Sequence, residues 1–98
     1  MVKNKIILTT GTFNVVHAGH IELFEYCKKL NGKLIVGVNC DNYVIHKYGS
    51  KSVLLKNRLK VLEQIKLIDE VVVFKETTPI ELILKIKPDM YVLSLIHI

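Results

Sequence analysis

The sequence predicts an α/β fold, an open and mostly parallel sheet with helices on both faces. Short apolar segments rich in β-branched residues alternate along the chain with segments whose apolar residues recur at helical spacing. The apolar segments are continuous rather than alternating, which is typical of strands covered on both faces. Ligands bind such sheets beyond the carboxyl ends of the strands, so the loops that follow the strands are the candidate sites.

The first half of the chain predicts a strand, a helix and a second strand. The first strand covers 5–10, and the helix covers 18–30, where apolar residues recur every three or four positions. Asn31 and Gly32 then end the helix in the manner of a left-handed cap. The second strand covers 33–39, which makes the connection a right-handed parallel crossover.

The second half predicts the same alternation. The expected elements are a short helix over 41–46, a polar loop over 47–52, a helix marked by Leu55, Leu59, Leu62 and Ile65, a strand over 71–74, a helix over 79–87 and a strand beginning at Met90. Arg58 is expected near the start of its helix, on a different face from the apolar stripe. Thr78 supplies a capping hydroxyl before Pro79 at the first helical position, and Glu81 follows three residues after the cap.

Composition favours a single small globular domain. The chain has 98 residues, of which 50% are hydrophobic and 23% charged, a balance that argues against a disordered or fibrous protein. Its apolar runs are far shorter than the ~20 residues that cross a bilayer, and its first residues do not form a signal peptide. We therefore expect a soluble, cytoplasmic protein without a membrane partner.

The net charge of +5 predicts an acidic partner, either a polyanionic small substrate or a nucleic acid. The basic residues are spread over several predicted faces and lack the interleaved aromatic residues of a base-stacking surface, so no nucleic-acid partner is expected. Cys27 and Cys40 have neither the spacing nor the context of a zinc site or a disulfide. Both are expected to be buried, reduced thiols.

The segment 11–20 joins the first strand to the first helix and carries most of the expected chemistry. His17 and His20 are three residues apart at the helix start, so both rings are expected to face the same way out of the first turn. A helix start also presents N–H groups and a partial positive charge, which favour a phosphate. Two ordinary polar residues remain an alternative, whereas zinc ligation or a histidine-activated nucleophile would need further residues that the segment lacks.

The order Gly11-Thr12-Phe13, then His17-Ala18-Gly19-His20, resembles the nucleotide-binding signature of the cytidylyltransferase-like nucleotidyltransferase superfamily, known as the HxGH motif. That superfamily has a Rossmann-like fold. The resemblance continues through 34–41, Lys47, Arg58, 68–72 and 78–89. In these later segments the chain is most similar to the adenylyltransferase domain of bacterial ADP-heptose synthase, and next to glycerol-3-phosphate cytidylyltransferase.

The resemblance implies transfer of a nucleoside monophosphate from ATP or CTP to a sugar or polyol phosphate, with release of pyrophosphate. It also implies Mg²⁺ bound with the nucleoside triphosphate and no covalent enzyme intermediate. Catalysis then consists of aligning two anions and stabilising the charge that develops on the phosphate oxygens. A glycerol-3-phosphate cytidylyltransferase and a nucleotide-binding module without catalysis are the alternatives, and a homodimer is one expected assembly.

Carried onto this chain, the resemblance implies that His17 and His20 contact the triphosphate and its transition state, and that Gly19 lets the helix backbone approach a phosphate. Lys47 would cover a phosphate from its loop and Arg58 would reach the same phosphates, with a solvated surface charge as the alternative for each. The nucleotide pocket would be lined by Thr10, Gly11, Thr12 and Phe13.

The chain also departs from the family pattern. The family usually has aspartate where this chain has Asn14, which keeps a hydrogen-bonding group but not its charge. Asp41 would contact a ribose or the acceptor or, as we favour, cap the short helix. After the fourth strand the family continues with a glycine-rich acidic turn and a Ser/Thr-rich loop, whereas 93–98 resembles a translated sequencing adapter. We therefore expect a nucleotidyltransferase domain over 1–92 that is incomplete at its C-terminus, followed by a non-native tail.

Overall fold

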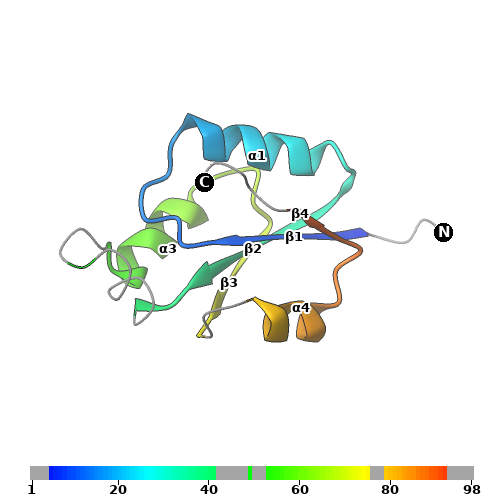
Figure 1. Ribbon diagram of the computed structural model, residues 1–98. Coiled ribbons are helices and arrows are strands. Elements are labelled where there is room, and N and C mark those ends of the chain that lie inside the picture. Colours follow the sequence, from blue (N-terminus) through cyan, green and yellow to red (C-terminus); the bar gives the residue numbers. More distant parts are fainter. Residues whose placement is uncertain (1–4, 42–48, 50–52, 76–78, 93–98) are drawn as a thin grey trace.

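The computed structural model describes residues 5–41, 49, 53–75 and 79–92 (Figure 1). Its elements follow the predicted order: β1 (Lys5–Gly11), α1 (Ala18–Lys28), β2 (Gly32–Asn39), α3 (Leu55–Glu63), β3 (Glu70–Phe74), α4 (Ile80–Ile86) and β4 (Met90–Val92). Most of the expected short helix over 41–46 and of the loop over 47–52 lies outside the described residues, as do Lys47, Thr78 and the segment 93–98. Within the described part, no helix is long and apolar enough to span a membrane.

The four strands form one parallel sheet in the order β3-β2-β1-β4. Figure 1 shows α1 above this sheet and α4 below it, and α3 packs into the same core as α1. The Rossmann-like α/β fold with helices on both faces is confirmed. The chain runs from β1 outward to β2 and β3, then returns to place β4 on the other side of β1. The strand order therefore reverses between β1 and β4, where open α/β sheets bind their ligands.

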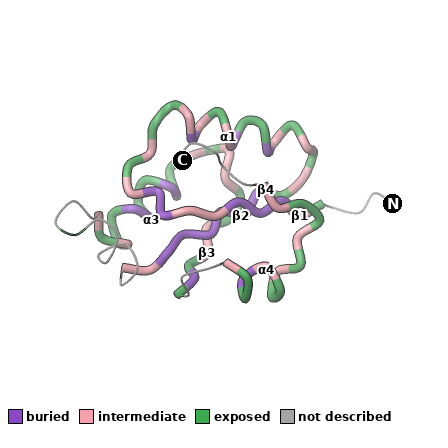
Figure 2. The backbone as a smooth tube through the Cα atoms, in the orientation of Figure 1, coloured by how far each residue is buried: buried purple, intermediate pink, exposed green. Residues whose placement is uncertain are grey.

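Two hydrophobic cores lie on the two faces of the sheet, and Figure 2 shows the buried residues concentrated along the inner strands β1 and β2. Ile7 and Leu8 are neighbours on β1, point to opposite faces and are both 0% exposed. This double burial explains why the apolar residues of β1 are consecutive rather than alternating. On the α4 face, a Cβ added to Gly37 would lie 2.7 Å from the end of the Leu82 side chain, so any larger residue there would force that side chain to shift.

The element ends agree with the sequence in part. α1 ends at Lys28 with Lys29 as a right-handed C-cap, two residues before the predicted end at 30. Asn31, two residues after this cap, has the expected left-handed conformation with a φ of 58°. α4 begins at Ile80, one residue later than predicted, so Pro79 is its N-cap rather than its first helical residue. Such one-residue shifts are ordinary at helix ends, where the first turn is held by few hydrogen bonds.

Two aspartates hold the outer strands in register at the amino edge of the sheet. Asp69 donates its N–H to the Leu34 carbonyl at 3.0 Å, and its carboxylate accepts the Leu34 N–H at 2.7 Å. Asp89 makes the same pair of bonds with Ile6, at 2.8 and 2.7 Å. Two of the segments that resemble the family, 68–72 and 78–89, thus contribute to register rather than to the carboxyl edge of the sheet.

Replacing Asp69 by asparagine is expected to lower the free energy of unfolding by about 1–2 kcal/mol at pH 7, because two charge-assisted hydrogen bonds are weakened. Partial burial raises the pKa of Asp69. Hydrogen bonds from the Lys28 ammonium and the Leu34 N–H, together with the charges of Lys28 and Lys33, lower it by more, so the pKa lies below its ordinary value. A carboxylate with a lowered pKa in the folded state stabilises the fold above its unfolded pKa of about 4, and this stabilisation is lost as the pH falls through the folded pKa.

Urea unfolding at pH 7 and at pH 2.5 measures this effect. The difference between wild type and Asp69→Asn should shrink at the acidic pH. The exposed pair of Lys33 and Glu70, 2.8 Å apart, offers a control, since Glu70→Gln should change stability little. A loss of equal size at both pH values would show that the Asp69 charge does not contribute.

Candidate functional site

The loop after β1 folds back tightly and brings an aromatic ring against His20. Phe13 adopts the left-handed conformation with a φ of 50°, and its ring lies 3.2 Å from the position of a Cβ at Gly11. Phe13 is 2% exposed, and its ring packs edge-on against His20 at 5.4 Å and at a tilt against Phe24 at 5.9 Å. Phe13 therefore supports His20 from the hydrophobic core.

His17 and His20 form a reciprocal capping box at the start of α1. His17 is the N-cap, and its Nδ1 accepts the Gly19 N–H at 3.0 Å. The His17 N–H donates in turn to Nδ1 of His20 at 3.1 Å. The two ring centroids are 4.2 Å apart. Imidazoles here take the places that serine or threonine and glutamate usually take in such a box.

This capping box fixes how each imidazole is protonated. Because Nδ1 accepts a hydrogen bond in both rings, the proton of each neutral imidazole lies on Nε2, which makes Nε2–H the donor. The rings are adjacent as predicted, but His17 is exposed whereas His20 is 0% exposed. The Gly19 N–H is already bonded to His17, so an anion at this helix start would depend on the imidazole donors more than on that backbone group.

Arg58 is buried and joins three segments of the site. It is 1% exposed, so the alternative of a solvated surface charge is wrong. Its Nη1 donates to the carbonyls of Thr12 at 3.0 Å and Asn39 at 2.6 Å. Its Nε donates to the Val53 carbonyl at 2.8 Å, and Nη2 to the Asp41 carboxylate at 3.2 Å. In this structure Arg58 holds the histidine loop against the end of β2, and its contact with a phosphate stays a prediction.

The expectation that Arg58 lies off the apolar stripe is also wrong. Arg58 comes three residues after Leu55 and four before Leu62, a spacing that places all three on one face of α3. Leu62 is 0% exposed and lies in the core shared with α1. Arg58 extends from this buried face toward the carboxyl ends of the strands.

Asp41 and Asn14 both bind the segment that leads into α3. The Asp41 carboxylate accepts the Leu55 N–H, at the first residue of α3, as well as the Arg58 bond. The cap expected on the short helix lies outside the described residues and stays a prediction. The Asn14 Oδ1 accepts the Val53 N–H at 2.6 Å. Aspartate and asparagine both have this oxygen, so the change of charge at Asn14 leaves the bond intact.

The remaining predicted residues occupy different positions around the ends of the strands. The Thr10 hydroxyl is hydrogen-bonded to the hydroxyl of Tyr91 on β4, a residue that sequence reasoning did not single out. Thr12 is 7% exposed, and its carbonyl is bound by Arg58. Only the pairing of β4 with β1 brings Tyr91 beside Thr10, which is why no local pattern pointed to it.

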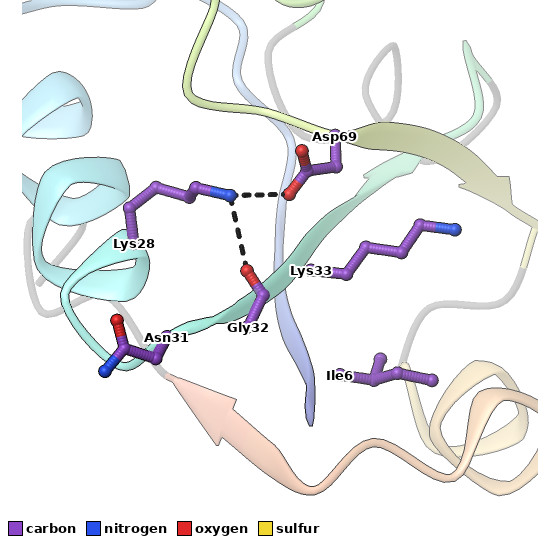
Figure 3. Close-up of a pocket in the computed structure, with 6 residues that line it drawn as sticks. All are labelled: Ile6, Lys28, Asn31, Gly32, Lys33 and Asp69. Carbon is purple, nitrogen blue, oxygen red and sulfur yellow. Dashed lines mark hydrogen bonds and ion pairs between the residues drawn. The ribbon is translucent and has the colours of Figure 1, made fainter. Parts of the chain in front are cut away.

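A cavity of about 320 Å³ lies beside the histidine loop. It is lined by Phe13, Asn14, Val15, Val16, Val53, Asn57, Arg58 and Val61. A larger depression of about 730 Å³ lies at the opposite, amino edge of the sheet. In Figure 3, Lys28 crosses this depression to reach the carboxylate of Asp69 and the carbonyl of Gly32. Those charges satisfy one another far from the histidines, so the carboxyl edge remains the candidate site.

Residues 8–98 match the family model described as cytidylyltransferase-like, and the chain belongs to this family. Similar proteins include two called "Bifunctional protein HldE". The one from Helicobacter pylori strain P12 is 41% identical over 92 residues, which are 92% of this chain and 20% of that protein. The one from Magnetococcus marinus is 35% identical over 88% of this chain and 18% of that protein. The chain thus spans about a fifth of the length of these relatives.

A solved structure supports the same assignment. The lipopolysaccharide core biosynthesis protein from Thermoplasma volcanium superposes with a TM-score of 0.78 at 25% identity, over 89% of this chain and 71% of that one. The resemblance stated from the sequence is therefore confirmed at the level of family and fold. The family model and the similar proteins together support the nucleotidyltransferase class for this chain.

Proposed function

We propose that this chain provides the catalytic domain of a nucleotidyltransferase that transfers a nucleoside monophosphate from ATP or CTP to a sugar or polyol phosphate. The observation that carries this proposal is the histidine capping box at the start of α1, at the carboxyl edge of the sheet. It supplies imidazole Nε2–H donors at a helix N-terminus, a place suited to phosphate. The resemblance to ADP-heptose synthase makes a heptose phosphate the first acceptor to test, and glycerol 3-phosphate the second.

The proposed reaction is an in-line displacement at the α-phosphorus of the triphosphate. An oxygen of the acceptor phosphate forms a bond to phosphorus as the bond to pyrophosphate breaks. The imidazoles of His17 and His20 would donate hydrogen bonds to phosphate oxygens and stabilise the charge that develops there. Arg58 would keep the histidine loop and the end of β2 in place through its bonds to the Thr12 and Asn39 carbonyls.

Magnesium enters this proposal as part of the nucleotide substrate. Mg²⁺ prefers oxygen ligands and is commonly held by substrate phosphates with one or two carboxylates. The Asp41 carboxylate near the loop is already bonded to Arg58 and Leu55, which fits a cation held mainly by the phosphates and water. When bound, it would neutralise part of the triphosphate charge. We place the protein in the cytoplasm, and a homodimer stays a prediction.

A pyrophosphate-release assay tests the proposal. ATP and CTP are each combined with D-glycero-D-manno-heptose 1-phosphate, glycerol 3-phosphate or glucose 1-phosphate, with Mg²⁺ or with EDTA, while calorimetry measures triphosphate binding. We expect pyrophosphate release with one nucleotide and one acceptor, and none with EDTA. Triphosphate binding without release for any pair would favour a non-catalytic nucleotide-binding module. If neither triphosphate binding nor pyrophosphate release is found, both the nucleotidyltransferase and the non-catalytic nucleotide-binding module are contradicted.

A further inference from the structure

Two hydroxyl groups meet at the point where the strand order reverses. Thr10 lies near the carboxyl end of β1, and its hydroxyl is hydrogen-bonded to the Tyr91 hydroxyl from β4. Both residues are half-buried, so the pair is partly open to solvent. Tyr91 pairs with Leu8 in the sheet and packs in the core beneath the α4 face. The pair therefore lies on the α4 side of the sheet, whereas the histidines extend from α1 on the other side.

Asn39 places a further polar group on the same side, at the carboxyl end of β2. It pairs with Phe74, a member of the core on the α4 face, and lies two residues beyond Gly37, the partner of Thr10. Asn39 is 5% exposed, and its Oδ1 is buried without a hydrogen-bond partner in the described part of the chain. A buried acceptor without a donor is unfavourable, and native folds seldom retain one without a reason.

Asn39 is also joined to the histidine loop. A single nitrogen of Arg58 donates to the Asn39 and Thr12 carbonyls, so the end of β2 and the loop after β1 are held side by side. The backbone of Asn39 thus adjoins the histidine loop at the carboxyl edge of the sheet, while its side chain lies on the α4 face, as those of Thr10 and Tyr91 do.

Resting on the function proposed above, we propose that Asn39, Thr10 and Tyr91 form the subsite that binds the hydroxyl groups of the acceptor. In an in-line displacement, the attacking and leaving oxygens lie on opposite sides of the phosphorus. With pyrophosphate leaving toward the histidines on the α1 side, the acceptor approaches from the α4 side. A polyol or sugar hydroxyl donates to the free oxygen of Asn39, while the Thr10 and Tyr91 hydroxyls both donate and accept.

Equilibrium binding to the full chain tests this subsite. The probes are ATP with Mg²⁺, inorganic phosphate, adenosine, glycerol 3-phosphate, heptose 1-phosphate and glucose 1-phosphate, and the variants are Tyr91→Phe and Asn39→Leu. For at least one of the three hydroxylated phosphates, each variant should weaken binding about 3- to 10-fold, the usual effect of one hydrogen bond. Binding of ATP and inorganic phosphate should stay within about twofold. Asn39→Leu should also raise the thermal unfolding midpoint, because it removes a buried unpaired acceptor.

Thr9→Val is the matched control. The Thr9 hydroxyl is also buried without a partner among the described residues, but Thr9 adjoins Thr10 on β1 and so points to the opposite face. This variant should bind every probe as wild type does. The subsite would be wrong, and the proposed function would stand, if ATP binds but one of two results is found. One is that both variants bind all three hydroxylated phosphates as wild type does; the other is that wild type binds none of the three. Loss of adenosine binding in Tyr91→Phe would also contradict the acceptor subsite, because the Thr10 and Tyr91 hydroxyls would then bind the nucleoside. Failure of ATP to bind wild type would instead remove the proposed function.

Discussion

Replacing His20 by alanine is expected to lower turnover roughly 10²–10³-fold, the usual effect of losing one donor that stabilises a transition state. The imidazole is 0% exposed, packs edge-on against Phe13, and accepts the His17 N–H through Nδ1. Its removal takes away the Nε2–H donor and releases one half of the capping box, which also allows His17 to move. Steady-state pyrophosphate release measures the change, and circular dichroism verifies that the variant is folded.

One further substitution separates the donor from the cap, and another serves as a surface control. His20→Asn retains an acceptor for the His17 N–H but has no group at the position of Nε2, so it should lose as much turnover as alanine. Glu22→Gln on the exposed face of α1 should leave turnover unchanged. Near-normal turnover in His20→Ala would contradict the assignment of the capping box to the reaction.

Replacing Arg58 by methionine is expected to lower the free energy of unfolding by about 3–5 kcal/mol, because buried partners lose their donor. The substitution leaves the carbonyls of Thr12, Asn39 and Val53 without the guanidinium, and the Asp41 carboxylate without its cation. A small domain is stable by only about 5–15 kcal/mol, so this loss would leave it marginal at best. Arg58→Lys should recover part of the loss, since one ammonium cannot reproduce the fork that spans these acceptors.

Chemical denaturation measures these differences, with Lys60→Met as the control. Lys60 is an exposed residue of the same helix, and its substitution should change stability by no more than about 0.5 kcal/mol. If Arg58→Met keeps the wild-type stability and loses only turnover, then Arg58 contacts the phosphates directly, as the resemblance implied, and its positioning role is wrong.

The sequence was informative where a pattern is local. Continuous apolar runs over 5–10 and 33–39 predicted doubly covered strands, and both are buried inner strands of the sheet. Asn31 predicted a left-handed helix end, and the order of strand, glycine turn and paired histidines predicted the family. These features depend on residues only a few positions apart, so neighbours in the chain suffice to specify them.

The sequence was less informative where polar groups find distant partners. Arg58 lies in the apolar stripe by its spacing, yet charge alone suggested a surface or ligand role. Its acceptors lie 46 and 19 residues away, at Thr12 and Asn39, and converge on it only after β1 and β2 have paired. Asp69 likewise binds Leu34 across 35 residues, and Thr10 binds Tyr91 across 81.

By itself, the sequence determined the α/β class, the order of the elements and the place of the histidines at the start of α1, because periodicity and helix capping depend on nearby residues. Tertiary structure alone decided that Arg58 is buried and that Tyr91 meets Thr10 where the strand order reverses. It also decided that both histidines accept backbone N–H groups through Nδ1 at the start of α1, and that Asn39 is buried at the end of β2. The physical reason is that a buried polar group must find a partner, and which partners are within reach is set by how the strands pair.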